Sequence, residues 1–370
     1  MKLLRRISLS ARSRLVKFGL DPGSPEGRVK ERDPSYSNRV EREIEHYKSV
    51  ENVHDLPEIF HFWSNKYLRP KVEEVFGVSG IDDFYAKYIF QFRADHPDQL
   101  LEIVSLGAGN SDSEIRIAKF LRDRGLTNFR FQCLDINPNM LQRGREAAVE
   151  EHLAGEFEFL EEDVGHWQPA RPVAIVMAHH SLHHMVALEE VFSSVKVAIG
   201  KDGYFLTCDM VGRNGHMRWP EALEIIQGIW QTMPDRYKYN HQLKRFEQMF
   251  VNWDCSQEGF EGVRAQDILP LLVRNFYFEG IVAFGNLPDI FVDRSFGHNF
   301  DPQNPEDIEF IDRIAALNDR LIDEEVIKPT QIIAALRGRP TRSLRCYRHW
   351  TPDYCIRHVT EKVLREEGAS

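Results

Sequence analysis

The sequence has 370 residues, 42% of them hydrophobic, which is enough for one large domain with additions or for two domains with a sizeable core. Its formal net charge of −10 argues against general nucleic-acid binding, because phosphate recognition needs a surplus of clustered Lys and Arg. The five cysteines are odd in number and include no C-x-x-C pair. They therefore favour neither a disulfide framework nor a zinc ribbon, and they predict reduced thiols and a cytoplasmic location.

The N-terminal part of the chain is basic. Residues 1–20 carry six basic and no acidic side chains, with apolar residues near one helical face and no apolar core of signal-peptide length. This pattern predicts a terminal helix that frays or packs on the protein, and weak peripheral membrane contact is the alternative. The stretch that follows is rich in Pro, Gly, Ser and charge, so residues 1–45 are interpreted as a basic segment plus linker.

Residues 46–98 space their aromatic side chains at helical intervals, which predicts two or three helices in an N-terminal cap. From residue 99, short apolar runs alternate with helical segments of ~10 to 15 residues, a pattern typical of βαβ units. The prediction is an α/β fold with a doubly wound, mostly parallel sheet over 99–338. Its last strands are expected at 276–285 and 330–338.

Two long stretches inside this core, 210–275 and 286–329, exceed ordinary connections and are interpreted as inserts that form lids or pocket walls. Residues 339–370 begin with basic and aromatic side chains. A solvated extension is predicted there, and a polyanion-binding tail is the alternative. No stretch reaches the ~18 apolar residues of a membrane span.

The first strand of the core ends in a glycine turn within "IVSLGAGNSDSEI". In an open α/β sheet, ligands bind outside the carboxyl ends of the strands. Gly107 and Gly109 allow a sharp turn and a close approach of the backbone to a ligand. A tight turn without a ligand is the alternative, so the neighbouring strand ends decide the interpretation.

Two acidic residues close the next two predicted strands. Asp135 ends "FQCLDIN", where a carboxylate can accept hydrogen bonds from both hydroxyls of a ribose. Asp163 ends "FLEED", where a carboxylate can accept from an exocyclic amine. A glycine turn, a ribose acceptor and an adenine acceptor at adjacent strand ends predict an adenosine derivative.

The residues after the turn indicate which derivative it is. A dinucleotide fingerprint requires a third glycine that lets the helix approach a pyrophosphate, and Asp112 occupies that position. Glu114 adds a second carboxylate. Two carboxylates repel a pyrophosphate but suit an ammonium or sulfonium, which points to S-adenosylmethionine. A nucleotide-dependent oxidoreductase on a related sheet is the alternative.

In the order of these motifs the sequence resembles the class I S-adenosylmethionine-dependent methyltransferases. "VSLGAGNSD" is similar to their first motif, "LDIN" and "EEDV" to their strand-two and adenine-side acids, and "VMAHHSLHHM" to their fourth-strand motif. The resemblance implies a seven-stranded Rossmann-like sheet with an antiparallel final strand. The sequence departs from that family at Ser105, where an acid is usual, and at Ser111, where a third glycine is usual. Three stretches outside the core resemble a bacterial subgroup.

The resemblance also implies which residues contact the cofactor. In that family the glycine turn faces the methionine part, the strand-two acid faces the ribose, and residues at the third strand end bracket the adenine. The implied cofactor residues are Gly107, Ala108, Gly109, Asn110, Asp112, Asp135, Ile136, Asp163, Val164 and His179.

Histidines gather at the end of the fourth predicted strand, where the resemblance places the transferred methyl. In-line transfer to a hydroxyl or amine requires an aligned acceptor and removal of its proton, which a neutral imidazole can perform. His183 and His184 are the candidate bases; helix capping, or positioning without a base, are the alternatives. No bound metal is expected, because the strand end interrupts the helical spacing of His179 and His183 that a ligand pair requires.

Polar and aromatic residues of the inserts complete the predicted site and suit a hydroxyl-rich or carboxylate-bearing acceptor, although such loops are often ordered by their own hydrogen bonds. The substrate-binding candidates are Asp209, Arg213, His216, Trp219, Arg264, Arg294 and His298. The predicted function is methyl transfer from S-adenosylmethionine to an oxygen or nitrogen of a small-molecule or glycan-type acceptor. A non-catalytic methyltransferase-like scaffold is the alternative, and the sequence leaves the acceptor and the oligomeric state open.

Overall fold

The structure is a computed structural model that describes residues 34–48, 56–257 and 259–358. The chain divides into two compact units, residues 1–38 and 39–370, and the architecture below is that of the second. The predicted N-terminal helix within residues 1–20 and the end of the C-terminal extension lie outside the described residues. Among the described residues, no helix combines the length and the apolar character that crossing a membrane requires.

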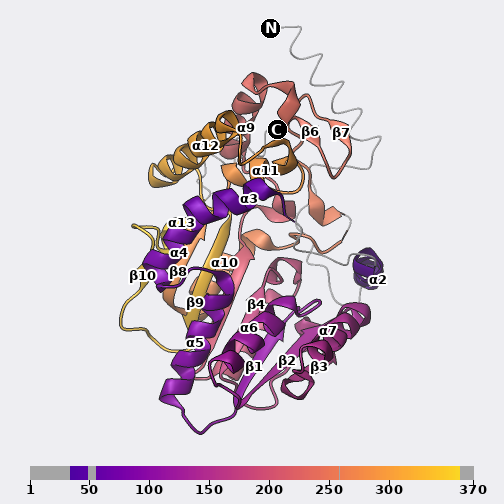
Figure 1. Cartoon of the computed structure of the whole chain (residues 1–370), viewed down its shortest axis with the longest axis vertical. Coiled ribbons are helices and arrows are strands. Elements are labelled where there is room, and N and C mark those ends of the chain that lie inside the picture. The colour runs from indigo at the N-terminus through magenta and orange to yellow at the C-terminus, as the bar shows by residue number, and fades with distance from the viewer. Residues whose placement is uncertain (1–33, 49–55, 258, 359–370) are drawn as a thin grey trace. The chain divides into compact units, whose positions relative to one another are not determined.

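A sheet of eight strands forms the centre of the fold (Figure 1). Its strands, in chain order, are β1 Leu101–Leu106, β2 Phe129–Asp135, β3 Phe157–Glu161, β4 Ile175–His179, β5 Tyr204–Met210, β8 Tyr277–Phe284, β9 Gln331–Arg337 and β10 Arg345–Cys346. Their order across the sheet is β10-β8-β9-β5-β4-β1-β2-β3. Strand β9 is antiparallel to both β5 and β8, whereas the other pairs are parallel.

The predicted α/β fold and its mostly parallel sheet are therefore confirmed, including the antiparallel final strand. The predicted count of seven strands is one too low. Strand β10, only two residues long, pairs with the edge of β8. So short a run carries no alternation of apolar and polar residues that could reveal a strand.

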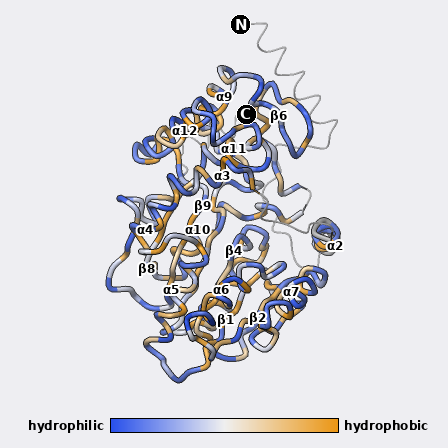
Figure 2. The backbone as a smooth tube through the Cα atoms, viewed as in Figure 1, coloured by the Kyte–Doolittle hydropathy of each residue, from blue (hydrophilic) through white to orange (hydrophobic). Residues whose placement is uncertain are grey.

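Helices cover the sheet on both faces. The main ones are α5 Ile81–Asp95, α6 Asp112–Asp123, α7 Pro138–Glu150, α8 Leu188–Ile199 and α10 Ala265–Asn275. The chain moves from β1 toward β3 on one side and from β4 to β5 on the other, so right-handed connections place α6 and α7 on one face and α8 on the opposite face. Figure 2 shows hydrophobic and hydrophilic residues alternating along α6 and α7, which is typical of helices with one face on a sheet.

The region before β1 is helical, with α2 Pro34–Lys48, α3 Glu58–Trp63, a π-helix Ser64–Leu68, α4 Arg69–Phe76 and then α5. Helices are thus present where the aromatic spacing predicts them. Helix α2, however, occupies part of the predicted linker. Val40, Ile44 and Tyr47 have helical spacing, but the Pro- and Gly-rich sequence before them obscured this pattern.

The two inserts carry the remaining elements. These are α9 Pro220–Thr232, the hairpin β6 Tyr239–Asn240 and β7 Arg245–Phe246, α11 Leu287–Val292 and α12 Pro305–Asp323. Outside the inserts, the short helix α13 Pro352–Cys355 follows β10. Single-turn 3₁₀ helices lie at Ala154–Glu156, Val164–His166, Leu182–His184, Asn214–His216, Asp235–Tyr237, Cys255–Gln257 and Gly297–Asn299.

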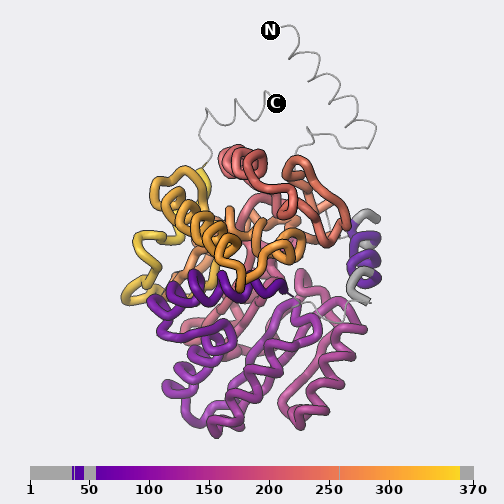
Figure 3. The backbone as a smooth tube through the Cα atoms, turned by 45° about the horizontal axis from the view of Figure 1, so that its top comes forward, coloured from indigo at the N-terminus to yellow at the C-terminus, as the bar shows by residue number. Residues whose placement is uncertain are grey.

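Both inserts begin at the carboxyl edge of the parallel strands. The first follows Met210 at the end of β5, and the second follows β8. Because Gln331, the first residue of β9, pairs with Met210, the second insert also returns to this edge. Helix α3 contacts α11, and Figure 3 shows the orange second insert beside the indigo cap helices. The cap and the second insert therefore meet.

Candidate active site

The carboxyl ends of four neighbouring strands are more open than the strands themselves. Strand β1 is buried along its whole length, but Gly107 to Gly109, which follow it, are partly exposed. Asp135 at the end of β2, Asp163 after β3 and His179 at the end of β4 are also partly exposed. The strand order reverses between β1 and β4, and this is where an open α/β sheet binds its ligand.

The glycine turn packs directly against the turn that follows β4. Gly107 and Gly109 have φ values of 67° and 55°, which favour glycine. A Cβ on Gly107 would lie 2.7 Å from the Cβ of Ser181. The Ser181 hydroxyl in turn donates to the Leu106 carbonyl at 2.6 Å. The glycine at 107 is therefore required by both backbone conformation and space.

Gly107→Ala is expected to lower the free energy of unfolding by roughly 2 to 4 kcal/mol, since it adds left-handed strain to a steric clash. Urea denaturation measures the loss. Gly155→Ala is the matched control, because no heavy atom lies within 4 Å of a Cβ added there. Equal denaturation midpoints for the two variants would contradict the conclusion that position 107 requires glycine.

Asp135 is held at the edge of the glycine turn. One carboxylate oxygen accepts from the Gly109 N–H and the other from the Asn137 N–H, each at 2.8 Å. Burial raises the pKa of Asp135, whereas these two N–H groups and the positive charge of His184 oppose that rise. The predicted ribose acceptor is thus oriented by the turn itself, and Ile136 beside it is partly exposed.

The other predicted cofactor residues also lie in the loops at this edge. Asp163 caps the following 3₁₀ turn by accepting from the Gly165 N–H at 2.9 Å, and Val164 is buried beside it. Asn110 accepts from the Arg143 side chain at 2.9 Å. Ala108 donates its N–H to the Leu134 carbonyl at 2.9 Å, which connects the glycine turn to β2.

Of the two carboxylates expected to face a cation, only one is partly exposed. Asp112 lies in the first turn of α6 and is partly exposed, but Glu114 is only 3% exposed. Its carboxylate accepts from the Ser105 hydroxyl at 2.6 Å. Burial raises the pKa of Glu114 to about 7, although the Ser105 hydrogen bond opposes this rise. Glu114, in the first turn of α6, therefore places a carboxyl group beside Ser105. Ser105 is the position at which the resembled family usually has an acid.

Glu114→Gln is expected to flatten the pH dependence of stability. The folded chain raises the pKa of this carboxyl from 4.5 to about 7. Its stabilising contribution is therefore complete below pH 4.5 and is lost as the pH rises through 7. Burying the charge then costs about 3 kcal/mol, which Gln avoids while still accepting from Ser105.

Urea denaturation between pH 4.5 and pH 8 measures this effect, with the wild type losing about 3 kcal/mol relative to the variant. Glu150→Gln, which changes an exposed residue of α7, serves as the control and should follow the wild-type curve. A difference between Glu114→Gln and the wild type that stays constant over this range would rule out the buried charge.

Asp209 at the end of β5 organises the turn after β4. One of its oxygens accepts from the Ser181 and Leu182 N–H groups at 2.9 and 2.8 Å. The other lies 2.6 Å from Nδ1 of His183. Asp209 and His183 are 0% and 3% exposed. The carboxylate therefore fixes both the turn and the orientation of the imidazole.

Glu261 lies on the opposite side of this imidazole and faces three histidines. Its Oε1 is 3.4 Å from Nε2 of His183 and 2.6 Å from Nε2 of His216, and its Oε2 is 3.3 Å from Nε2 of His184. Together with Asp209, these residues form a group that we call the histidine–carboxylate cluster. It unites the turns after β4 and β5 with the loop before α10.

The charges of the cluster are strongly coupled. Burial alone would lower the pKa of His183, but Asp209 and Glu261 outweigh it and raise that pKa to about 10. Burial lowers the pKa of His216, despite its contact with Glu261. The two carboxylates thus favour the protonated form of His183. This differs from the neutral imidazole that the sequence analysis expects of a base.

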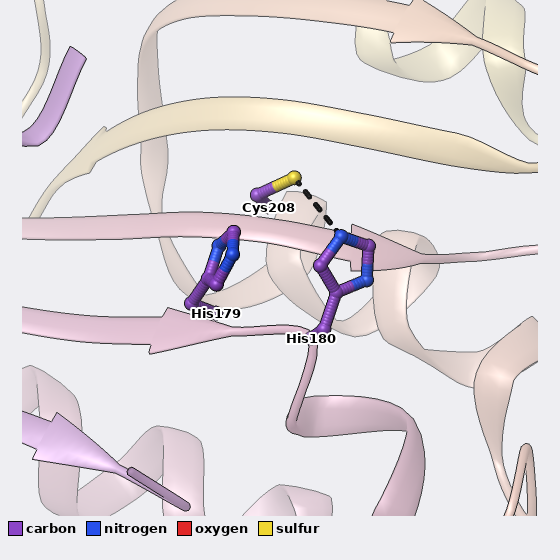
Figure 4. Close-up of side chains that lie close together, drawn as sticks. All are labelled: His179, His180 and Cys208. Atoms are coloured by element: carbon purple, nitrogen blue, oxygen red, sulfur yellow. Dashed lines mark hydrogen bonds between the residues drawn. The ribbon is translucent and has the colours of Figure 1, made fainter. Parts of the chain in front are cut away.

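Two further histidines, His179 and His180, lie at the end of β4 close to Cys208 (Figure 4). His180 is exposed, has a φ of 50°, and its Nε2 is 3.6 Å from Sγ of Cys208 on neighbouring β5. His179 has its Nδ1 3.4 Å from the hydroxyl of Tyr85 on α5. Tyr85, a residue of cap helix α5, therefore contacts the predicted cofactor residue His179.

The structure divides the substrate-binding candidates. Asp209 and His216 belong to the cluster, whereas the others have neighbours within or beside the inserts. The Arg213 guanidinium lies 5.4 Å from the centre of the Trp219 ring. Arg264 forms ion pairs with Glu189 at 2.6 Å and Asp267 at 2.8 Å.

Two candidates from the second insert lie beside residues that the sequence analysis did not consider. Arg294 is 3.6 Å from Asp293, and the His298 ring lies 5.1 Å from the His241 ring. His298 is exposed, whereas Arg294 is partly buried. These contacts give both residues local neighbours outside the histidine–carboxylate cluster.

Sequence reasoning missed Glu261, the residue on which the cluster converges. It stands in "EGFEGVR", far along the chain from the histidines that it meets. The glycines on both sides indicate a turn but say nothing about its neighbours. Glu43 was also missed: its carboxylate lies 2.9 Å from Nδ1 of His184, and it belongs to the stretch interpreted as a linker.

Comparisons with known proteins agree with this arrangement. Residues 97–253 match a family model described as a methyltransferase domain. The matched stretch contains the glycine turn, both strand-end acids and the histidines after β4. The comparison with curated proteins found none of similar sequence.

Solved structures are similar to the chain at low sequence identity. The O-methyltransferase from the trans-AT PKS multienzyme of Brevibacillus brevis is 11% identical, with 69% of this chain and 74% of that chain covered and a TM-score of 0.38. Geranyl diphosphate C-methyltransferase from Streptomyces coelicolor A3(2) is 11% identical, with 81% and 98% covered and a TM-score of 0.41. The DszA carbon methyltransferase is 15% identical, with a TM-score of 0.32, and the match spans only 35% of each chain.

The family match, the strand order and the open edge beyond β1 to β4 agree with one another. Residues 97–253 therefore match a methyltransferase domain, as the resemblance to the class I S-adenosylmethionine-dependent family predicts.

Proposed function

We propose that the chain transfers the methyl group of S-adenosylmethionine to an oxygen or nitrogen atom of a small-molecule or glycan-type acceptor. The observation that carries this proposal is the position of the histidine–carboxylate cluster. Its turn contacts the glycine turn through Ser181 and Gly107, so polar groups for an acceptor lie next to the cofactor edge. In the reaction, the methyl carbon leaves the sulfonium, the new bond forms in line with it, and the acceptor loses a proton.

On the cofactor side we assign Asp135 to the ribose hydroxyls, and Asp163 with Val164 to the adenine. Asp112 is assigned to the ammonium of the methionine part, because it is the more exposed of the two carboxylates near the turn. Gly107 to Gly109 allow the close approach of the backbone. Apart from the buried Val164, the assigned residues are partly exposed and lie at or just after the carboxyl ends of β1, β2 and β3.

On the acceptor side we assign His183 and His184 to binding and aligning the acceptor. Asp209 and Glu261 favour the protonated form of His183, so alignment suits this residue better than action as a base. His216 and the Arg213–Trp219 pair are proposed as the facing wall. All five cysteines are free, which supports a reducing, cytoplasmic location as part of this proposal.

Calorimetric titration with S-adenosylmethionine, S-adenosylhomocysteine and NADH tests the proposal, followed by transfer of labelled methyl to pools of alcohols, amines and carboxylates. We expect binding of both adenosyl ligands, no binding of NADH, and label in one pool. Failure of the folded chain to bind the adenosyl ligands would favour a scaffold, and NADH binding would favour an oxidoreductase.

A further inference from the structure

We propose that His183, His216 and Glu261 bind a divalent transition-metal ion, and that this ion holds an oxygen atom of the acceptor. The inference rests on the proposed function, because it names the group that recognises the acceptor. The sequence analysis expected no metal, since it considered only the spacing of histidines at one strand end. Folding adds one ligand from each of two further segments, the turn after β5 and the loop before α10.

The three ligand atoms have the separations of a metal coordination shell. One ring nitrogen of His183, one of His216 and a carboxylate oxygen of Glu261 all lie within 4.8 Å of one another. The two distances to Oε1 of Glu261 are 3.4 and 2.6 Å. With metal–ligand bonds of about 2.1 Å, neighbouring ligands are ~3.0 Å apart in an octahedron and ~3.4 Å apart in a tetrahedron. Small side-chain adjustments would therefore suffice.

The hydrogen-bond pattern around His183 matches that of a metal-bound imidazole. Its Nδ1–H is directed at Asp209, so Nε2 faces Oε1 of Glu261. In the protein alone a proton on Nε2 can lie between this nitrogen and Glu261, and a bound ion would take the place of that proton. A carboxylate that accepts the other ring N–H is the usual support of a metal-ligating histidine. Asp209, 0% exposed, provides that support.

The donor set and its exposure indicate the kind of ion. Two imidazoles and one carboxylate are the ligands of catalytic zinc sites and of non-haem iron sites, so we name the class as divalent first-row transition metals. The His216 and Glu261 side chains are 20% and 35% exposed, which leaves a side open to an acceptor oxygen. His184 lies on the other oxygen of Glu261 and could serve as a further donor.

A second set of residues must be distinguished from this one. His179, His180 and Cys208 also bring three ligand atoms within 4.8 Å of one another (Figure 4). Cys208 is 5% exposed, and burial raises the pKa of its thiol, which disfavours the thiolate that binds metals. This set also contains no carboxylate. We therefore assign the ion to the Glu261 set.

The test is titration of the untagged full-length chain with Co²⁺ after removal of metals by a chelator and dialysis. Visible absorption and calorimetry report binding, and Zn²⁺ competes for the site. We expect one Co²⁺ per chain, and at least a ~100-fold loss of affinity in His216→Gln and in Glu261→Gln, because each variant removes a ligand. His61→Gln, which removes an exposed histidine of α3, is the control and should bind as the wild type does.

Three outcomes would overturn the assignment: no stoichiometric Co²⁺ binding, wild-type affinity in both ligand variants, or loss of binding in His180→Gln alone. S-adenosylmethionine binding is measured on the same samples. Its absence in the wild type counts against the proposed function, whatever the Co²⁺ result. Retained cofactor binding in His216→Gln together with lost Co²⁺ binding supports the metal site and shows that the variant is folded.

Discussion

Asp135→Ala is expected to weaken the binding of S-adenosylmethionine by ~10- to 150-fold. The carboxylate lies partly exposed at the end of β2, and the N–H groups of Gly109 and Asn137 hold both of its oxygens in place. Charge-assisted hydrogen bonds to ribose hydroxyls are worth about 1.5 to 3 kcal/mol, which corresponds to this loss. Calorimetric titration at fixed pH and salt measures it.

Asp98→Ala is the matched control for this measurement. It removes the same charge from an exposed position before β1, at the opposite end of the sheet. The control should bind the cofactor as the wild type does. If Asp135→Ala also bound with unchanged affinity, the ribose assignment would be wrong, and the cofactor would have to lie elsewhere on the sheet edge.

Asp209→Ala is expected to lower the free energy of unfolding by about 3 to 5 kcal/mol. The side chain is fully buried and accepts from the backbone N–H groups of Ser181, Leu182 and Met210, as well as from His183. Its removal leaves two buried N–H donors, the partly buried N–H of Met210 and the His183 ring without their acceptor, and breaking a buried pair typically costs this much. Urea denaturation followed by circular dichroism measures the change.

Asp202→Ala provides the comparison, just before the same strand. This residue lies before β5, and its ion pair with Arg339 at 3.3 Å is exposed on both sides. Exposed pairs contribute at most about 1 kcal/mol, so the control should unfold close to the wild-type midpoint. Similar losses in both variants would mean that Asp209 contributes no more than a surface charge.

The sheet and its cofactor edge were predictable because their signals are local. Each strand is an apolar run bounded by a turn, and Gly107, Asp135 and Asp163 directly follow such runs. Strand β10 lacks that signal, since a two-residue strand forms only because β8 offers a free edge. Helix α2 was hidden by the composition of its neighbours.

The acceptor side was predictable only in part. His183 could be placed at a strand end, but its partners could not, because contacts between distant segments depend on how the inserts fold back. Glu261 reaches the cluster from the loop before α10. Glu114 could be read as one of two carboxylates after the turn, but not as a buried group, because burial depends on how α6 packs on β1.

The return of the second insert to the edge from which it leaves has an evolutionary consequence. Its ends are held by β8 and β9, which pair along nearly their whole lengths. The entropic cost of a longer loop between fixed ends grows only slowly, by about 0.6 kcal/mol for each doubling. Lineages can therefore lengthen, shorten or exchange this segment while the sheet persists.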